Sequence, residues 1–198
     1  MAKTDFILVR CRLGDAAPLA AAARAFCDTG PWPMALHRAA WAEASQQAYV
    51  YARLPAATEV DDAQRAALAL RWQQACPGAQ AVDVARLALL FDAPGYSLAE
   101  APVHHYVVET DAEEGWAGEI DRWYDTEHMP GLAAVPGCIH ARRLRNLDSG
   151  PQSLACYDLV TEDTLGSPPW LAVRGTAWSD IARPHFRNTR RTMMRAVA

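Results

Sequence analysis

The order of strand-like and helix-like stretches is the feature of this sequence that most restricts its fold. Short apolar runs rich in strand formers predict strands, and apolar residues at helical spacing behind capping residues predict helices. In the first half the predicted elements are the strand 6–9, the helix 19–26, the strand 48–54 ended by Pro55, a helix capped at Thr58 and Asp61 and ended by Pro77, and the strand 81–91. The stretch 36–44 fits neither pattern clearly.

The same order of elements returns after the turn-rich stretch 92–102. The second set comprises the strand 103–110, the helix 114–130 with a stop at Pro130, the strands 138–144 and 154–160, a helix from Ser167 to Pro184, and the strand 186–197. Each half therefore reads β-α-β-β-α-β, the ferredoxin-like plan, in which one face of an antiparallel sheet carries both helices. An apolar sheet face left bare in water is a liability. We therefore predict an α+β protein of two such halves, residues 1–93 and 103–198 joined by the linker 94–102, whose sheets pack together.

Composition narrows the class of protein. The chain has 198 residues, a formal net charge of -4 and five cysteines without CxxC or zinc-ligand spacing. A slightly acidic surface is a poor partner for nucleic acid or anionic membranes, and an odd cysteine count suits a reducing cytoplasm rather than a disulfide framework. We expect no signal peptide and no membrane-spanning segment, because Met1–Asp5 leads directly into a strand-like run and no apolar stretch is long enough.

The stretch from Asp121 to Gly131 concentrates aromatic and ionisable residues near one predicted helix end. Trp123 falls on the stripe that should face the sheet, and His128 lies on its flank, four residues after Tyr124. An imidazole with a pKa near 6.5 is suited to proton transfer at neutral pH. The alternative is a histidine that only interacts with the dipole at the C-terminus of the helix. Glu127 is either a rim residue or a buried partner for a cation.

The segment Trp123-Tyr124-Asp125-Thr126-Glu127-His128-Met129-Pro130 resembles the W-Y-x-x-x-H-x-P signature of the dimeric α/β-barrel superfamily, especially its EthD-like branch. The resemblance implies that two ferredoxin-like units pair their sheets into a barrel around a small, often aromatic or polyketide-like ligand. Members include cofactor-independent monooxygenases, cyclases, isomerases and dehydratases, together with haem-using relatives and proteins of unknown activity. The resemblance also implies that His128 is an acid or base that faces the pocket, with Tyr124 as its companion.

The first half departs from this signature. Its corresponding helix, 19–27, is mostly alanine and has no histidine. The departure suggests an internal duplication in which only the second half carries an equipped site.

Alternation along the predicted strands supplies candidate ligand-binding residues. His104 shares a strand face with Tyr106, His140 with Arg142, and Arg190 with its neighbours two positions away. If these faces line the barrel, the arginines could hold a carboxylate, phenolate or enolate. The alternative is a solvated or ion-paired surface, which we favour for the other arginines, listed as Arg143, Arg145, Arg187, Arg191 and Arg195.

Cofactor signals are weak. Asp125 with His128 is the only local pair with metal-ligand spacing, and His128 or His185 could ligate haem, but nothing singles out iron. Together with the resemblance, which implies the reaction types, this predicts a cofactor-independent, metal-free small-molecule enzyme of the isomerase, cyclase, dehydratase or monooxygenase type. Its ligand would be aromatic or carbonyl-containing and would lie in a barrel pocket, and we expect no nucleic-acid or membrane partner. The competing hypotheses are a non-catalytic ligand-binding or structural barrel protein and, third, a haem-binding barrel enzyme. Further dimerisation of the chain is left open.

Overall fold

The computed structural model describes residues 3–198 and divides into two compact units. The first unit comprises the chain up to Leu89 with Asn146–Ser149 and Met194–Ala198, and the second comprises Leu90–Arg145 with Gly150–Met193. Among the described residues, no helix is long and apolar enough to cross a membrane.

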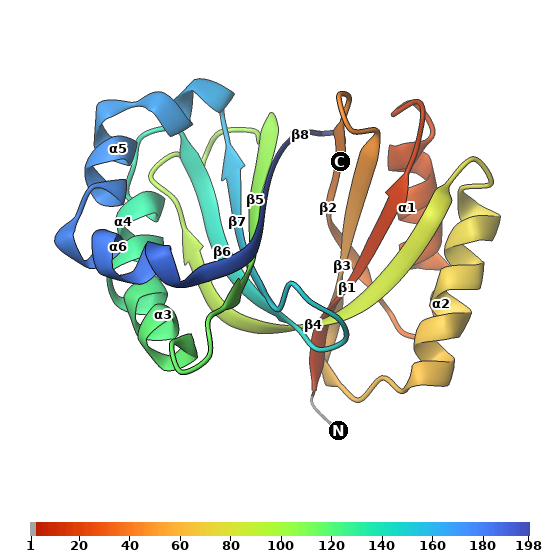
Figure 1. Cartoon of the computed structure of the whole chain (residues 1–198). Coiled ribbons are helices and arrows are strands. Elements are labelled where there is room, and N and C mark those ends of the chain that lie inside the picture. The colour runs from red at the N-terminus through yellow and green to blue at the C-terminus, as the bar shows by residue number, and fades with distance from the viewer. Residues whose placement is uncertain (1–2) are drawn as a thin grey trace. The chain divides into compact units, whose positions relative to one another are not determined.

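The first unit contains one four-stranded antiparallel sheet with two helices on one face (Figure 1). Its elements are β1 (Thr4–Arg12), α1 (Leu19–Asp28), β2 (Ala35–Ala42), β3 (Gln47–Thr58), α2 (Asp62–Ala75) and β4 (Gln80–Pro94). The strand order is β4-β1-β3-β2. Phe26 of α1 and Trp72 of α2 meet edge to face at 5.6 Å in the core between helices and sheet. The ambiguous stretch 36–44 is thus largely strand β2.

Two predicted boundaries in the first unit were wrong. Asp61 alone caps α2: its carboxylate accepts from the Gln64 backbone N–H, and the Gln64 side chain accepts from the Asp61 N–H. Strand β3 also continues past Pro55 to Thr58. Its pairing with β1 changes register beyond Arg53, so Pro55 lies where no regular ladder hydrogen bond is lost.

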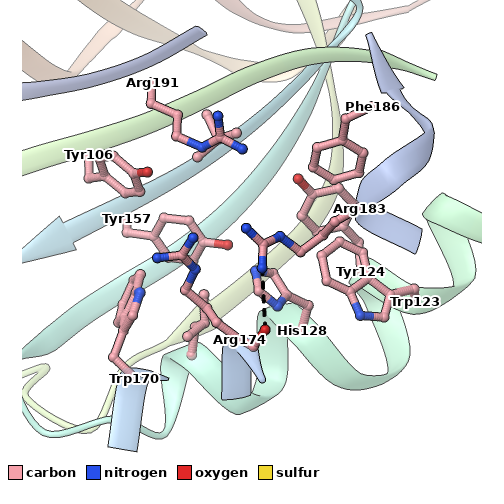
Figure 2. A pocket seen from close by; sticks show the side chains of 12 residues that line it. Tyr106, Trp123, Tyr124, His128, Tyr157, Trp170, Arg174, Arg183, Phe186 and Arg191 are labelled. Carbon is pink, nitrogen blue, oxygen red and sulfur yellow. Dashed lines mark hydrogen bonds between the residues drawn. The ribbon is translucent and has the colours of Figure 1, made fainter. Parts of the chain in front are cut away.

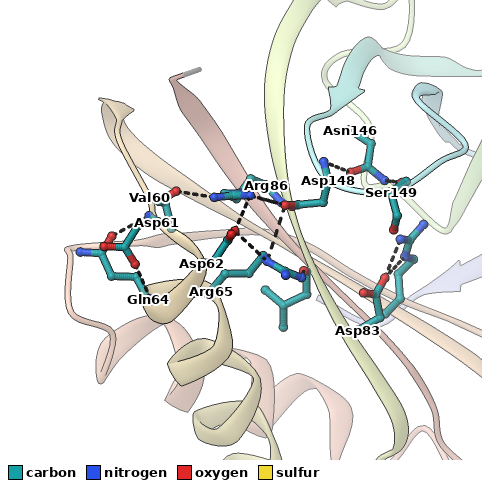
Figure 3. Close-up of polar contacts among 12 residues, drawn as sticks. Val60, Asp61, Asp62, Gln64, Arg65, Asp83, Arg86, Asn146, Asp148 and Ser149 are labelled. Carbon is teal, nitrogen blue, oxygen red and sulfur yellow. Dashed lines mark hydrogen bonds and ion pairs between the residues drawn. The ribbon is translucent and has the colours of Figure 1, made fainter. Parts of the chain in front are cut away.

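A short return of the chain, Asn146–Ser149, belongs to the first unit because Asp148 binds Arg86 on β4 (Figure 3). The Asp148 carboxylate accepts from the Arg86 backbone N–H at 2.7 Å and from its Nε at 3.0 Å. The Arg86 guanidinium also donates to the Val60 carbonyl at 2.7 Å. The hydrogen bond that Arg86 donates to the Asp148 carboxylate raises the pKa of Arg86 despite partial burial. A partly buried charge pair with backbone hydrogen bonds therefore holds this turn against β4.

The second unit repeats the order of elements with a more broken helical layer. Its elements are β5 (His104–Ala112), α3 (Ala117–Trp123), the π-helical segment η1 (Tyr124–His128), α4 (Met129–Ala133), β6 (Cys138–Asn146), β7 (Ser153–Leu159), η2 (Glu162–Gly166), α5 (Pro168–Arg174), α6 (Ala177–Ala182), η3 (Arg183–His185) and β8 (Phe186–Ala196). The strand order is β8-β5-β7-β6, and the helices lie on one face of this sheet (Figure 1). Numbered within each unit, the strand order is fourth, first, third, second. It is the same in both units.

Both predicted helices of the second unit differ from the structure. The first does not end at Pro130 but continues to Ala133, and its middle turn is π-helical. A proline inside a regular helix meets the carbonyl of residue i-4, and the wider π turn before Pro130 relieves that conflict. The second predicted helix is divided at Gly175, after which Thr176 caps α6 by accepting from the Ser179 N–H at 3.1 Å.

The stretch predicted as a linker, 94–102, is part of the second compact unit. The backbone N–H groups of Gly95, Tyr96 and Ser97 donate to the carbonyls of Ile139, Ala133 and Cys138 at 2.8, 2.8 and 2.9 Å. The predicted boundaries at 93 and 103 stay predictions, since the compact units also exchange the short segments described above.

Candidate functional site

The motif that carried the sequence hypothesis forms the π-helical turn of the helix that packs on the sheet of the second unit. Trp123 precedes this turn and is 1% exposed, while Tyr124 and His128 occupy its two ends and are both buried. The π turn inserts one extra residue into the helix, a feature frequently found at functional sites. Here it leaves Trp123, Tyr124 and His128 packed together on one side of the helix.

His128 is held by aromatic contacts. Its ring stacks on Trp123 with centroids 4.2 Å apart and meets Tyr124 edge to face at 5.6 Å. Its Nδ1 has no hydrogen-bond partner among residues 3–198. Burial, followed by the nearby charges of Arg174 and Arg183, lowers the pKa of His128 to about 3. The imidazole is therefore neutral at physiological pH, and a role at a helix C-terminus is excluded because the helix runs on to Ala133.

Replacing His128 with phenylalanine is expected to make the fold less sensitive to acid. The folded-state pKa of about 3 lies below the ordinary 6.5, so the unfolded chain takes up the proton first as the pH falls. The stability contributed by the neutral imidazole is complete above pH ~6.5 and is lost as the pH falls toward ~3. Between pH 7 and pH 5 the wild type should lose about 2 kcal/mol more unfolding free energy than His128→Phe. Urea denaturation at both pH values measures this, and equal losses would contradict a histidine kept neutral by the fold.

A pocket between the sheet and the helices of the second unit opens onto His128 (Figure 2). Its lining residues are Tyr106, Val108, Trp123, Tyr124, His128, Leu132, Tyr157, Trp170, Arg174, Arg183, Phe186 and Arg191. The cavity volume is about 30 Å³, and the space reaches about 400 Å³ when the open mouth is included. One or two water molecules fit as the side chains lie, on the order of the minimum for buried water. A larger ligand would have to displace side chains at the mouth.

Three tyrosines give the pocket phenolic walls. Burial raises the pKa values of Tyr106, Tyr124 and Tyr157 above the ordinary range, so their hydroxyls stay protonated and can donate hydrogen bonds. Tyr157 already donates to the sulfur of Met129 at 3.1 Å. The ring of Tyr124 lies under the Arg143 guanidinium, with Cζ 5.1 Å from its centroid. The pocket thus combines neutral donors with one neutral imidazole.

The structure brings together only part of the predicted site. Tyr106, Tyr124 and His128 line the same pocket. His104, at the start of β5, is not among the lining residues, and Arg190 is exposed in a separate shallow depression beside Asp111.

His140 and Arg142 form a different cluster, with Asp92. Arg142 Nη2 lies 2.8 Å from the Asp92 carboxylate and 3.1 Å from His140 Nε2, and His140 Nε2 lies 2.5 Å from Asp92. Burial of Asp92 opposes its ionisation, but Arg142 and His140 together outweigh this and lower its pKa. The intervening residue Ala141 packs in the core under the helices, so His140 and Arg142 lie on the opposite face of β6.

The carboxylates of the motif point away from the pocket. Asp125 pairs with the buried Arg143 at 3.0 Å, and Glu127 accepts a hydrogen bond from the Thr176 hydroxyl at 2.6 Å. Arg143, expected on the surface, is 1% exposed and also binds Asp121 at 2.5 Å. Within residues 3–198 no group of three His, Cys, Asp or Glu side chains is placed to hold a metal ion.

The sequence analysis did not predict the three arginines of the pocket. For one of them, Arg191, an irregularity in strand β8 explains why. Arg191 was assigned to the surface and Arg190 to the site because strict alternation was assumed along β8. Phe186 and Arg191 nevertheless both line the pocket, although they are five positions apart. Asn188 between them has a φ of 52°, a conformation that asparagine tolerates and that interrupts the alternation. Arg174 and Arg183 carry no comparable sequence signal.

No family model and no curated protein matches the chain. Solved structures match over nearly its whole length. A proposed monooxygenase from Fusobacterium nucleatum aligns with a TM-score of 0.67 at 8% identity, covering 100% of this chain and 94% of the other. An anthrone oxidase-like protein aligns with a TM-score of 0.65 at 11% identity and the same coverage. A mutant chlorite dismutase from Candidatus Nitrospira defluvii, in complex with cyanide, gives 0.60 at 6% identity, covering 98% and 92%.

These similarities, together with the order of elements, show a mixed α+β fold of the ferredoxin-like type. The prediction of a mixed α+β fold of this type is confirmed, and the duplication of two halves with paired sheets stays a prediction. At such low identity the likeness concerns the fold alone, so what the pocket does has to be argued from its own residues.

Proposed function

We propose that the second unit is a cofactor-independent small-molecule enzyme of the isomerase, cyclase, dehydratase or monooxygenase type, acting on an aromatic or carbonyl-containing ligand. The observation that carries this proposal is the neutral His128, whose Nδ1 has no partner among the described residues, in a pocket with phenolic and aromatic walls. Apolar walls with a few convergent polar groups are typical of ligand sites. The names monooxygenase and anthrone oxidase-like, given to proteins of this fold, point to related chemistry.

The arrangement suits proton transfer next to a carbonyl group. When a C–H bond beside a carbonyl breaks, its electron pair moves to oxygen as an enolate and the proton passes to a base. The low pKa makes His128 a weak base. A ligand anion near Arg174 and Arg183 would offset the effect of these two charges on that pKa, which comes after the effect of burial. A neutral imidazole can also donate a hydrogen bond to developing oxyanion charge. The Tyr124 hydroxyl is a second neutral donor, assigned to orienting the ligand or the imidazole.

The family assignment is part of the same proposal. Both units follow the order β-α-β-β-α-β with the fourth strand beside the first, which supports a tandem duplication. The motif of Trp123, Tyr124 and His128 occurs in the second unit alone, as expected if the first unit has lost its site. We propose that the chain is a two-unit member of the EthD-like branch whose sheets form an α/β barrel. Homodimer formation and a cytoplasmic location stay predictions.

The second candidate function is non-catalytic ligand binding, or a structural role, and the narrow cavity of about 30 Å³ favours it. A haem group does not fit this pocket as its side chains lie. His185, the other histidine considered for haem, does not line this pocket. Its ring stacks on Trp116 with centroids 3.3 Å apart, and its Nδ1 lies 2.5 Å from a Glu113 carboxylate oxygen.

Turnover of enolisable aromatic ketones, anthrone among them, tests the proposal. We expect the wild type to incorporate deuterium at the carbon next to the carbonyl or to oxidise it in air, followed by NMR and absorbance. His128→Gln should lower the rate by about 100-fold, the usual scale of general acid–base catalysis. Arg187→Gln, an exposed change outside the pocket, should leave it unchanged. A folded His128→Gln protein with wild-type turnover would exclude the catalytic role, and binding without turnover would favour the second candidate.

A further inference from the structure

Three arginines from three different elements converge on the pocket of His128 (Figure 2). Arg174 is the last residue of α5, Arg183 is the first of η3, and Arg191 lies in β8. Arg174 and Arg183 are partly buried, and Arg191 is exposed. The only hydrogen bond of these guanidinium groups within residues 3–198 runs from Arg183 Nη1 to the Arg174 carbonyl at 3.4 Å.

None of the three has a carboxylate within ion-pair distance in the described chain, although most arginines of the same unit do. Those that pair are Arg142 with Asp92, Arg143 with Asp121 and Asp125, Arg145 with Asp121, Arg122 with Glu119, and Arg187 with Glu113. Among residues 3–198 of this unit, the arginines without an acidic partner are therefore the three of the pocket and the exposed Arg190 outside it.

Bringing like charges together in a partly buried place is unfavourable. Burial, and after it the charges of Arg174 and Arg191, lowers the pKa of Arg183. A bound anion would offset this repulsion and would satisfy guanidinium N–H groups that have no acceptor among residues 3–198. Carboxylates match the planar guanidinium fork with two parallel hydrogen bonds.

The aromatic side chains that line the pocket form two groups. Tyr157 contacts Tyr106 at 6.2 Å and Trp170 at 5.2 Å between ring centroids. Across the pocket, Phe186 contacts Tyr124 with nearly parallel rings 5.9 Å apart. Because the cavity is small, a flat ring between the two groups would have to displace side chains at the mouth. The long arginine side chains at the mouth can swing outward to admit it.

We infer that Arg174, Arg183 and Arg191 form an oxyanion-binding site and that the ligand of this pocket is a planar aromatic carboxylate. The inference rests on the proposed function only in that both place a ligand in the same pocket. It adds the negative charge of that ligand, which the family resemblance does not specify.

Binding of 2-naphthoate and of its neutral analogue 2-naphthamide to the full chain tests the inference. Titration calorimetry, checked by tryptophan fluorescence, should show 2-naphthoate binding at least about tenfold more tightly, since charge-assisted hydrogen bonds exceed neutral ones by that order. Arg183→Gln and Arg191→Gln should each weaken 2-naphthoate about tenfold while leaving 2-naphthamide unchanged. Arg187→Gln, the matched control on the same strand, should change neither, because its charge is paired with Glu113 at 2.7 Å.

Equal affinity for the two probes, or no binding of either at millimolar concentration, would overturn the inference. The same holds if Arg191→Gln, an exposed change that should not affect folding, keeps the full preference for 2-naphthoate. His128→Gln separates this inference from the proposed function. That variant should keep the preference for 2-naphthoate. If it loses turnover but keeps this preference, the proposed function and the anion site are both supported. If the wild type shows the preference but no turnover, only the anion site is supported.

Discussion

Gly95→Ala is expected to lower the free energy of unfolding by about 3 kcal/mol or more, the upper range for forced overpacking. A β-carbon at position 95 would lie 2.2 Å from the carbonyl oxygen of Cys138 and 2.7 Å from the carbonyl carbon of Ile139. Both are backbone atoms of β6, which cannot move aside as a flexible side chain could. The same approach allows the Gly95 N–H to donate to the Ile139 carbonyl at 2.8 Å. The substitution therefore removes space and a hydrogen bond together.

Gly118→Ala is the matched control for this change. Gly118 lies in helix α3, and a β-carbon there would meet nothing within 4 Å. Alanine is a better helix former, so stability should rise by about 0.5–1 kcal/mol. Chemical denaturation of the two variants measures both effects. If Gly95→Ala proved as stable as the wild type, the close packing of residues 95–97 on β6 would be incorrect.

Trp123→Ala is expected to cost about 4 kcal/mol, the usual loss when a buried tryptophan is truncated. Trp123 is 1% exposed, stacks on His128, and contacts Tyr124 at 4.6 Å and Phe186 at 5.9 Å between ring centroids. Removing it opens a cavity beside the imidazole that water can enter. Because burial is the main cause of the low pKa of His128, that pKa should rise toward 6.5.

Trp123→Phe keeps most of the aromatic contact and removes an indole N–H that has no hydrogen-bond partner among residues 3–198. Its cost should be about 1 kcal/mol, within the range for conservative core changes. Urea denaturation gives the stabilities, and NMR titration of the His128 ring gives its pKa. A Trp123→Ala protein in which His128 remains neutral below pH ~5 would show that desolvation by Trp123 is not what lowers that pKa.

Much of the fold was predictable because its signals are local. Alternation and capping placed β1, β3, β5, β6, β7 and β8 close to where they lie. The boundaries that failed depend on neighbours. Pro55 is tolerated by an irregular stretch of pairing with β1, and Pro130 by the π turn before it.

The sequence indicated the histidine and two tyrosines of the pocket but not its arginines. Unusual residue density identified His128 and Tyr124, and Tyr106 followed from strand alternation. The same alternation failed for Arg191, because Asn188 adopts a positive φ that periodicity does not reveal. His140 and Arg142 obeyed alternation, but the sequence does not say which face of β6 the helices cover.

The sequence by itself determined the order of strands and helices and the position of one histidine motif, since both depend on residues close together in the chain. The tertiary structure alone decided that His128 is neutral and that Arg174, Arg183 and Arg191 surround its pocket. Charge state and pocket lining depend on desolvation and on groups from distant segments. These exist only once β5, β8 and the helices pack on one another.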